Sequence, residues 1–298
     1  MDTSPENILP SDHAAASLVG RVWNSDAAGP SLVCVRDGAI LDITSADAPT
    51  MRDLLEMDDP AAFVRSRPGA SLGAVEEIAA NSVAHRGDAT RPHMLAPFDL
   101  QAVKACGVTF AQSIIERVIE EMAKGDASQA DAIRARCIDI LGSSLTSVKA
   151  GSEEAEGVKQ ALIEAGMWSQ YLEVGIGPDA EVFTKAQPMS SVGWGADVGL
   201  HPVSEWNNPE PEIVLAVNSL GAVQGATLGN DVNLRDVEGR SALLLGKAKD
   251  NNASSAIGPF IRLFDDGYGI DDVRRAELKL EVTGEDGCAR ARIRRAFA

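Results

Sequence analysis

The hydrophobic periodicity changes along this chain, and the change constrains the fold more than any other feature. Between residues 111 and 172, apolar side chains such as Ile114, Val118 and Met122 recur at helical spacing. We therefore predict helices over residues 111–124, 129–141 and 153–172, whose apolar faces serve packing. After Gly175 the sequence consists of short β-rich runs separated by Gly, Pro and Asn. Helical and sheet-rich segments that follow one another predict an α+β fold.

The first 95 residues predict a small α/β unit. Two β-rich runs within residues 31–44 flank Asp37-Gly38, a step that supplies the positive φ of a tight hairpin turn. Thr50, followed by Asp53, predicts the capped start of a short helix, and a second helical pattern covers residues 72–85. Prolines then predict an extended connector. We expect a small amino-terminal domain over residues 1–95 and a second domain over residues 96–298.

Composition excludes several classes of partner. The formal charge of the 298 residues is −17, and no basic patch precedes the last few residues, which argues against nucleic acid. No apolar stretch approaches the roughly 20 residues needed to span a bilayer, and the amino terminus lacks the pattern of a signal peptide. We expect a cytoplasmic protein without a membrane partner. Cys34, Cys106, Cys137 and Cys288 form no CxxC pair, which favours reduced thiols over a zinc site.

Three carboxylates are the most informative candidates for chemistry. Glu210 and Glu212 flank Pro211 in an extended segment, so their side chains project from the same face. If residues 218–221 form a turn, the returning strand brings Asp231 close to Glu210. Oxygen donors without histidine or thiolate favour Mg²⁺, with Mn²⁺ as the alternative, over zinc. An acidic pair alone more often lies on a solvated strand face.

Four ordered motifs resemble the fumarylacetoacetate hydrolase family. They are the E-x-F-x-K run from Glu181 with the following serines, the E-x-E pair, the GNDVNLRD block at residues 229–236, and a lysine-containing loop that ends in GP at residues 258–259. The resemblance covers about residues 100 to 285. It implies a catalytic domain with a mixed β-roll that follows a small amino-terminal domain.

The resemblance also implies roles for individual residues. Glu210, Glu212 and Asp231 would bind Mg²⁺, while Glu181 and Lys249 would be the catalytic pair that faces a small 2-oxo acid substrate. Ser190, Ser191 and Arg235 would contact the substrate, although Arg235 has the alternative role of anchoring its block through Asp236. Lys185 and Lys247 are second-rank candidates, because a lysine on a strand edge or a helix face is more often solvated than catalytic. The resemblance further implies a homodimer or a higher homo-oligomer.

One departure from the family pattern indicates the reaction. Ser113 stands where members that hydrolyse carbon–carbon bonds often carry a histidine that activates water. The remaining motifs are most similar to the 2-keto-3-deoxy-pentonate dehydratases of the family, which convert 2-dehydro-3-deoxy-D-arabinonate, also described as the xylonate derivative, to 2,5-dioxopentanoate in pentose catabolism. Lys249, with a pKa lowered by burial and metal charge, would abstract a proton or stabilise an enolate, and Glu181 would act at the leaving hydroxyl. The sequence leaves open which of these two roles belongs to Lys249 and which to Glu181.

The carboxyl-terminal residues break the expected pattern. Residues 276–283 predict a strand and Asp286-Gly287 a hairpin turn, but the last eleven residues contain four arginines and no acid. We therefore expect a truncated chain with an incomplete β-roll, a short basic tail being the alternative. Besides the dehydratase, two functions remain open, namely an acylpyruvate-type hydrolase of the same family and an inactive truncated product.

Overall fold

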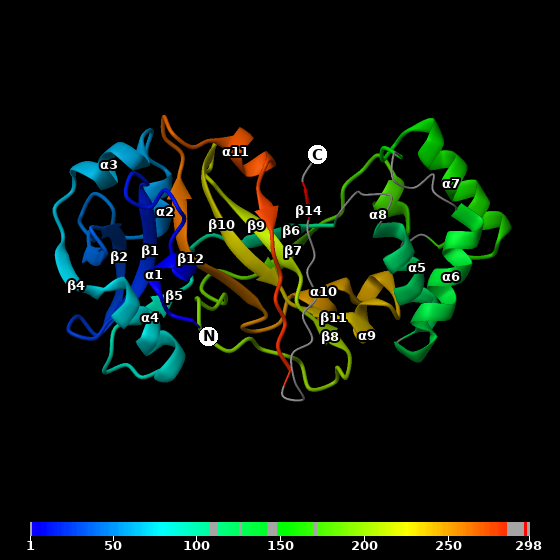
Figure 1. Ribbon diagram of the computed structural model, residues 1–298, viewed down its shortest axis with the longest axis horizontal. Coiled ribbons are helices and arrows are strands. Elements are labelled where there is room, and N and C mark those ends of the chain that lie inside the picture. The colour runs from blue at the N-terminus through cyan, green and yellow to red at the C-terminus, as the bar shows by residue number, and fades with distance from the viewer. Residues whose placement is uncertain are drawn as a thin grey trace.

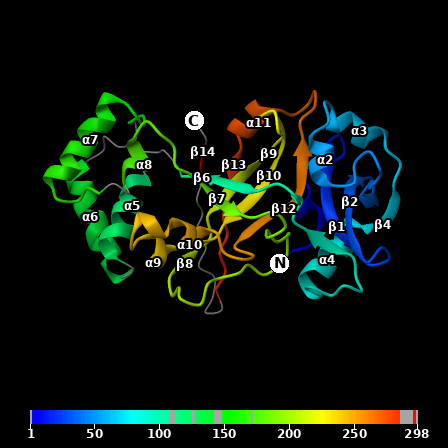
Figure 2. The same cartoon turned by 180° about the vertical axis from the view of Figure 1, so that it is seen from behind.

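The computed structural model describes residues 2–107, 113–124, 127–141, 148–169, 172–284 and 295–296. Figure 1 shows that a large sheet and the helices that cover it lie at one end of the molecule. The helices α5 (Ser113–Ala123) to α8 (Glu173–Ile176) lie at the other end. The short helices α9 (Arg235–Glu238) and α10 (Leu245–Lys249) lie between these two parts, and the view from behind in Figure 2 shows the same arrangement. Within the described ranges, no helix is long and apolar enough to cross a bilayer.

The large sheet has eight strands and joins distant parts of the sequence. Seven strands follow the order β4-β3-β2-β1-β12-β10-β9, and β5 also pairs with β1. The strands are β1 (Leu18–Asn24), β2 (Gly29–Arg36), β3 (Ala39–Asp42), β4 (Ala70–Ala74), β5 (His93–Leu95), β9 (Pro211–Val217), β10 (Val223–Asp231) and β12 (Ser255–Leu263). Because β1 pairs with β12, segments on both sides of residue 95 share one sheet. The division into domains 1–95 and 96–298 stays a prediction.

The amino-terminal hairpin and the first cap are confirmed. Asp37 and Gly38 connect β2 to β3 with φ values of 50° and 75°, the left-handed conformations that a tight hairpin turn requires. Thr50 caps α2 (Met51–Leu55), since its side chain accepts a hydrogen bond from the Asp53 amide. The helical pattern predicted from residue 72 begins later, as α4 (Val75–Ala84), because residues 70–74 extend the sheet as β4.

Both faces of the sheet are covered by helices. Successive residues of β1 alternate between the two faces: Leu18 packs in one cluster with Ile78 of α4, and Val19 packs in another with Leu54 of α2. The remaining amino-terminal helices are α1 (Pro5–Ile8) and α3 (Pro60–Ser66). Full burial of aliphatic side chains such as these stabilises the fold by about 2 kcal/mol each.

The helical part has its own apolar core. The short 3-10 helix Ala127–Gln129 precedes α6 (Ala130–Leu141), and α7 (Glu153–Glu164) follows. Ile114, Cys137 and Leu162 are fully buried in one cluster, which confirms the packing role predicted for the helical faces. The helix predicted to reach residue 172 ends at 164, because Gly166 adopts a left-handed conformation with φ of 66° just beyond the cap.

Smaller ladders and short helices complete the structure. The pairs are β6 (Val103–Cys106) with β7 (Val182–Ala186), β8 (Asn207–Asn208) with β11 (Asn233–Leu234), and β13 (Glu277–Leu278) with β14 (Arg295–Ala296). The 3-10 helix Ala242–Leu244 precedes α10, and α11 (Ile270–Arg274) follows β12. The predicted strand 276–283 is reduced to β13, and the predicted turn at Asp286-Gly287 lies outside the described residues. The mixture of a large antiparallel sheet with helices confirms the α+β class.

Candidate active site

The β9–β10 hairpin places the three predicted metal ligands. Asn218 and Gly221 form the predicted turn, in which the Gly221 amide donates to the Asn218 carbonyl at 3.0 Å. Antiparallel pairing then aligns Glu212 with Gly229. The Asp231 amide donates to the Glu210 carbonyl at 2.9 Å, so these two residues lie directly across the hairpin from each other. The structure therefore brings Asp231 beside Glu210 as the sequence predicted.

Lys249 connects these carboxylates to α10. Its Nζ lies 2.6 Å from Glu210 Oε2 and 3.2 Å from Asp231 Oδ2, and its side chain is 4% exposed. Burial alone lowers the pKa of this lysine, but the nearby carboxylates, Glu210 foremost, outweigh burial and raise it above its ordinary value. The lowered pKa expected for Lys249 included the charge of a bound metal ion, and it stays a prediction for the metal-loaded site. Burial would raise the pKa of Glu210, yet the Lys249 ammonium holds it below its ordinary value.

Two residues that the motifs did not assign extend this network. Asn233 is completely buried, and its Nδ2 donates to Glu210 Oε1 at 3.1 Å and also to Glu238 Oε2. Glu238 is buried as well, and its charge raises the pKa of both Lys249 and Glu181. Both residues lie in or just after the GNDVNLRD block. Asn233 lies in β11 and Glu238 ends α9, and their polar character within this block is the signal that the sequence offers for them.

Glu181 lies at the start of β7, where Arg117 of α5 faces it. The Arg117 guanidinium lies 3.8 Å from Glu181 Oε2, and the Gly107 amide donates to the Glu181 carbonyl at 2.9 Å. Burial raises the pKa of Glu181 and the Arg117 charge opposes this rise, with burial the larger effect. The carboxyl group therefore keeps its proton to higher pH than an exposed glutamate. This property suits a group that exchanges protons with a substrate.

Lys185 and Lys247 differ sharply in their surroundings. Lys247 is exposed on α10, as predicted. Lys185 is 2% exposed, so the prediction of a solvated side chain is wrong; β7 directs it into the interior beneath the hairpin. Its Nζ lies 3.1 Å from Asp231 Oδ1, and burial lowers its pKa although the Asp231 charge opposes that change.

Of the predicted substrate-binding residues, Ser190 and Ser191 lie in the loop after β7, and Arg235 begins α9. Ser190 Oγ donates to the Gln187 carbonyl at 3.0 Å, whereas Ser191 Oγ is buried and has no hydrogen-bond partner in the described part of the chain. The Arg235 guanidinium stacks over the Trp206 ring at 5.1 Å. Asp236 accepts hydrogen bonds from Ser204 Oγ at 2.6 Å and from the Glu205 amide at 3.2 Å. This block thus anchors the loop before β8.

Ser113, which stands at the position of the family's histidine, begins α5, and residues 108–112 of its motif lie outside the described residues.

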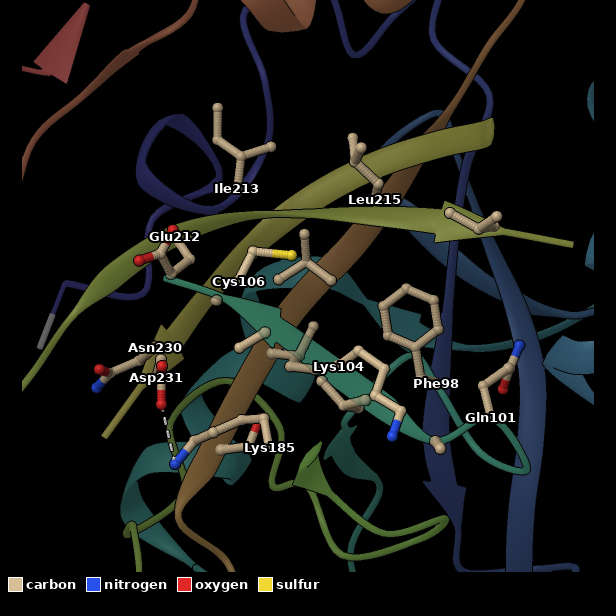
Figure 3. A pocket seen from close by; sticks show the side chains of 18 residues that line it. Phe98, Gln101, Lys104, Cys106, Lys185, Glu212, Ile213, Leu215, Asn230 and Asp231 are labelled. Carbon is tan, nitrogen blue, oxygen red and sulfur yellow. Dashed lines mark ion pairs between the residues drawn. The ribbon is translucent and has the colours of Figure 1, made fainter. Parts of the chain in front are cut away.

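A cavity of about 480 Å³ adjoins the hairpin. Figure 3 shows Lys185, Glu212 and Asp231 together at one end, with a dashed line that marks the ion pair between Lys185 and Asp231. Apolar side chains, including Phe98 and Leu215, line much of the remainder, together with Gln101 and Lys104. The cavity therefore combines a charged end with an apolar wall.

The donors of the hairpin suit a hard cation by their chemistry. Glu210, Glu212 and Asp231 offer only oxygen atoms, and buried Asp231 Oδ1 accepts no hydrogen bond from the described residues. Its contact with Lys185 is an ion pair without hydrogen-bond geometry. In the described ranges, no group of three or more His, Cys, Asp or Glu residues is arranged to hold a metal ion. The complete magnesium shell therefore stays a prediction.

Two proteins of assigned activity are similar in sequence to this chain. A protein of Haloferax volcanii described as a "probable 2-keto-3-deoxyxylonate dehydratase" is 27% identical over 253 residues, which cover 84% of this chain and 69% of that protein. The 2-dehydro-3-deoxy-D-arabinonate dehydratase of Saccharolobus solfataricus is 37% identical over 94 residues, which cover 30% of this chain and 32% of that enzyme. No family model matches the chain.

Solved structures confirm the expected fold. An apo 2-keto-3-deoxy-D-arabinonate dehydratase matches 83% of this chain with a TM-score of 0.51 and 19% identity. The same kind of enzyme in complex with magnesium and 2,5-dioxopentanoate matches 82% with a TM-score of 0.50 and 20% identity. This chain spans 66% and 65% of those two structures, slightly less than two thirds. It is a homologue of 2-keto-3-deoxy-pentonate dehydratases and has the fold of the fumarylacetoacetate hydrolase family that its motifs resemble.

Proposed function

We propose that this chain is a Mg²⁺-dependent dehydratase that converts a 2-keto-3-deoxy-pentonate to 2,5-dioxopentanoate. The observation that carries the proposal is the contact of Lys249 with both Glu210 and Asp231, in a chain similar to enzymes named for this reaction. A buried ammonium beside oxygen donors, with a proton-exchanging carboxyl group nearby, supplies the groups that elimination of water next to a 2-oxo acid requires.

Glu210, Glu212 and Asp231 would hold the magnesium ion. The absence of nitrogen or sulfur donors among these three residues supports this assignment. When bound, Mg²⁺ would supply Lewis-acid polarisation of the keto oxygen of the substrate. Mn²⁺ has the same preference for oxygen and is the alternative.

Lys249 would stabilise negative charge on the substrate. Its raised pKa keeps the side chain in the ammonium form, which can donate a hydrogen bond but cannot accept a proton. An ammonium group favours the oxyanion that develops when a proton leaves the carbon next to the keto group. We assign enolate stabilisation to Lys249; proton abstraction stays the alternative, because the charge of a bound Mg²⁺ would lower the pKa of this lysine.

Glu181 would move protons between the substrate carbons and the leaving group. Dehydration breaks a C–H bond at C3 and the C–O bond at C4, forms a C3–C4 double bond, and releases the hydroxyl group as water after it gains a proton. Because the pKa of Glu181 is raised, its carboxylate can accept the proton that leaves C3, and the resulting carboxyl group can then protonate the leaving hydroxyl group. Tautomerisation within the same carbon chain then gives 2,5-dioxopentanoate without an oxidant.

The proposal includes the setting of the reaction. A sugar-acid dehydratase of this kind would act in pentose catabolism in the cytoplasm, and we propose a homodimer from the family resemblance. Size-exclusion chromatography with light scattering would test the assembly, because a monomer at micromolar concentration would exclude it.

The direct test is a coupled assay with 2-dehydro-3-deoxy-pentonate and Mg²⁺ that follows formation of 2,5-dioxopentanoate. We expect EDTA to abolish turnover and added Mg²⁺ to restore it. Glu212→Gln should lower turnover at least 100-fold, whereas Glu205→Gln, on an exposed residue nearby, should leave it unchanged. Full turnover in EDTA, or in the Glu212 variant, would refute the metal site.

Two further outcomes separate the alternatives. Cleavage of an acylpyruvate without dehydration would identify the chain as a carbon–carbon hydrolase despite Ser113. A folded, monodisperse sample without either activity would identify it as an inactive product.

A further inference from the structure

Lys185 is a buried cation that connects three segments around the candidate site. Its Nζ donates to the Val232 carbonyl at 2.7 Å, to the Lys249 carbonyl, and to Ser254 Oγ at 3.2 Å. The same atom forms the ion pair with Asp231 Oδ1 at 3.1 Å. These partners belong to the end of β10, the end of α10 and the loop before β12.

The surroundings of Lys185 commit all of its protons. An ammonium group has three donors, and two backbone carbonyls and one hydroxyl group accept them here. Burial of such a charge is costly unless it is paired and fully hydrogen-bonded, and both conditions are met. A lysine with this environment is poorly suited to proton transfer and well suited to holding its neighbours in place.

The contact with the Lys249 carbonyl is important because α10 is short. This helix has five residues, and isolated helices of that length are not stable in water. Lys249 is its last residue, so its carbonyl has no partner within the helix, and a cation at this end is favourable. Ser254 Oγ also contacts the Lys249 carbonyl at 2.9 Å, so Lys185 and Ser254 together hold the end of α10.

We propose that Lys185 is a positioning residue that fixes the Asp231 carboxylate and the Lys249 backbone relative to each other. One ammonium group reaches both sides of the site, Asp231 through its carboxylate and Lys249 through its carbonyl. The Lys249 side chain is thereby placed to contact Asp231 from the opposite side, at Oδ2. The effect of Lys185 on turnover rests on the proposed function, whereas its effect on local structure does not.

The test compares Lys185→Met with Lys247→Met. Lys247 lies on the same short helix but is exposed, so its variant controls for loss of a lysine charge near the site. Hydrogen exchange of the metal-free protein measures positioning without substrate. We expect the amides of Asn251 and Ser254, whose hydrogen bonds stay within this loop, to exchange at least 10-fold faster in Lys185→Met. The amides of β1 and β2 should keep their wild-type rates.

Kinetics with saturating Mg²⁺ give the second measurement. Lys185→Met should lower kcat at least 10-fold for each folded molecule, with KM changed less than threefold, while Lys247→Met keeps both values. Unchanged exchange in residues 249–254 would overturn the proposal. So would faster exchange throughout the sheet, because that result indicates general destabilisation and no local role.

Ser254→Ala keeps the proposal testable if Lys185→Met does not fold. This substitution removes one acceptor of the Lys185 ammonium and leaves the charge, so it should increase exchange at the end of α10 by a smaller factor. The readout is the Asp250 amide, which donates to the Gly246 carbonyl at 2.9 Å, because the Asn251 amide donates to Ser254 Oγ itself. Wild-type exchange in Ser254→Ala would then overturn the proposal. If the wild-type chain has no dehydratase activity, the proposed function fails, yet the exchange experiment still decides the role of Lys185.

Discussion

Lys249 Nζ lies 2.6 Å from Glu210 Oε2, and this contact joins the end of α10 to the residue that precedes β9. The two residues are far apart in the sequence and belong to separate motifs. Their charges explain each other, because Lys249 keeps Glu210 ionised and Glu210 keeps Lys249 protonated. The protonation states of Lys249 and Glu210 are therefore a property of the pair and not of either residue alone.

Removal of the Lys249 ammonium should abolish most of the activity. Lys249→Met removes the donor to the developing oxyanion and leaves Glu210 and Asp231 without their shared counter-ion. We expect turnover to fall at least 100-fold in steady-state assays, with Lys247→Met at the wild-type rate. Circular dichroism would verify that both variants are folded. A Lys249 variant with more than a tenth of wild-type turnover would contradict the role of this residue.

Arg117 should set the pH range in which Glu181 works. Its charge lowers the pKa of Glu181 against the larger effect of burial, so Arg117→Met should raise that pKa further. The limb of the pH profile of kcat/KM that reports Glu181 should therefore move to higher pH. This is the alkaline limb if Glu181 acts as an acid and the acidic limb if it acts as a base. Arg134→Met, which removes an exposed ion pair with Asp131, should leave the profile in place. A limb that moves to lower pH would be incompatible with this electrostatic effect.

Much of the hairpin and its polar residues could be predicted from local patterns. The turn at Asn218–Gly221 and the alternation of side chains suffice to place Asp231 beside Glu210, because antiparallel pairing follows from a short turn. The turn at Asp37-Gly38 and the cap at Thr50 were predictable for the same reason. In each case the determining residues are neighbours in the sequence.

Features that depend on tertiary packing were not predictable. Lys185 was expected in solvent because lysine on a strand usually lies there, but two carbonyl groups from distant segments make its burial favourable. The carboxylates of other segments raise the pKa of Lys249 against the effect of burial, and no single motif shows that they surround this lysine. No single motif identifies Asn233 and Glu238, because tertiary packing alone brings Asn233 to Glu210 and Glu238 near Lys249.

Gly107 should be required because any larger side chain would displace Glu181. A Cβ at this position would lie 2.8 Å from Glu181 Oε2 and 3.1 Å from Arg117 Nη2, so the carboxyl group must shift. We expect Gly107→Ala to lower kcat about 10- to 100-fold, since small displacements of a reacting group have effects of this size. Gly157→Ala is the matched control, because a Cβ there meets nothing within 4 Å on α7; it should stabilise the protein by about 1 kcal/mol. Wild-type kcat in Gly107→Ala would argue against a precise role for Glu181.

Glu210 and Glu181 should affect stability with opposite dependence on pH. The folded-state pKa of Glu210 is lowered, so its stabilising contribution is full above the ordinary glutamate pKa of about 4.3 and is lost as the pH falls through the folded value. In EDTA, Glu210→Gln should therefore lower the free energy of unfolding by about 2 kcal/mol at neutral pH and by progressively less in acid.

The folded-state pKa of Glu181 is raised, so its stabilising contribution is full below about pH 4.3 and is lost as the pH rises through the folded value. The difference between wild type and Glu181→Gln should accordingly change in the opposite direction. Urea unfolding between pH 3 and 8 would measure both differences, and two curves of the same slope would contradict the assigned electrostatics.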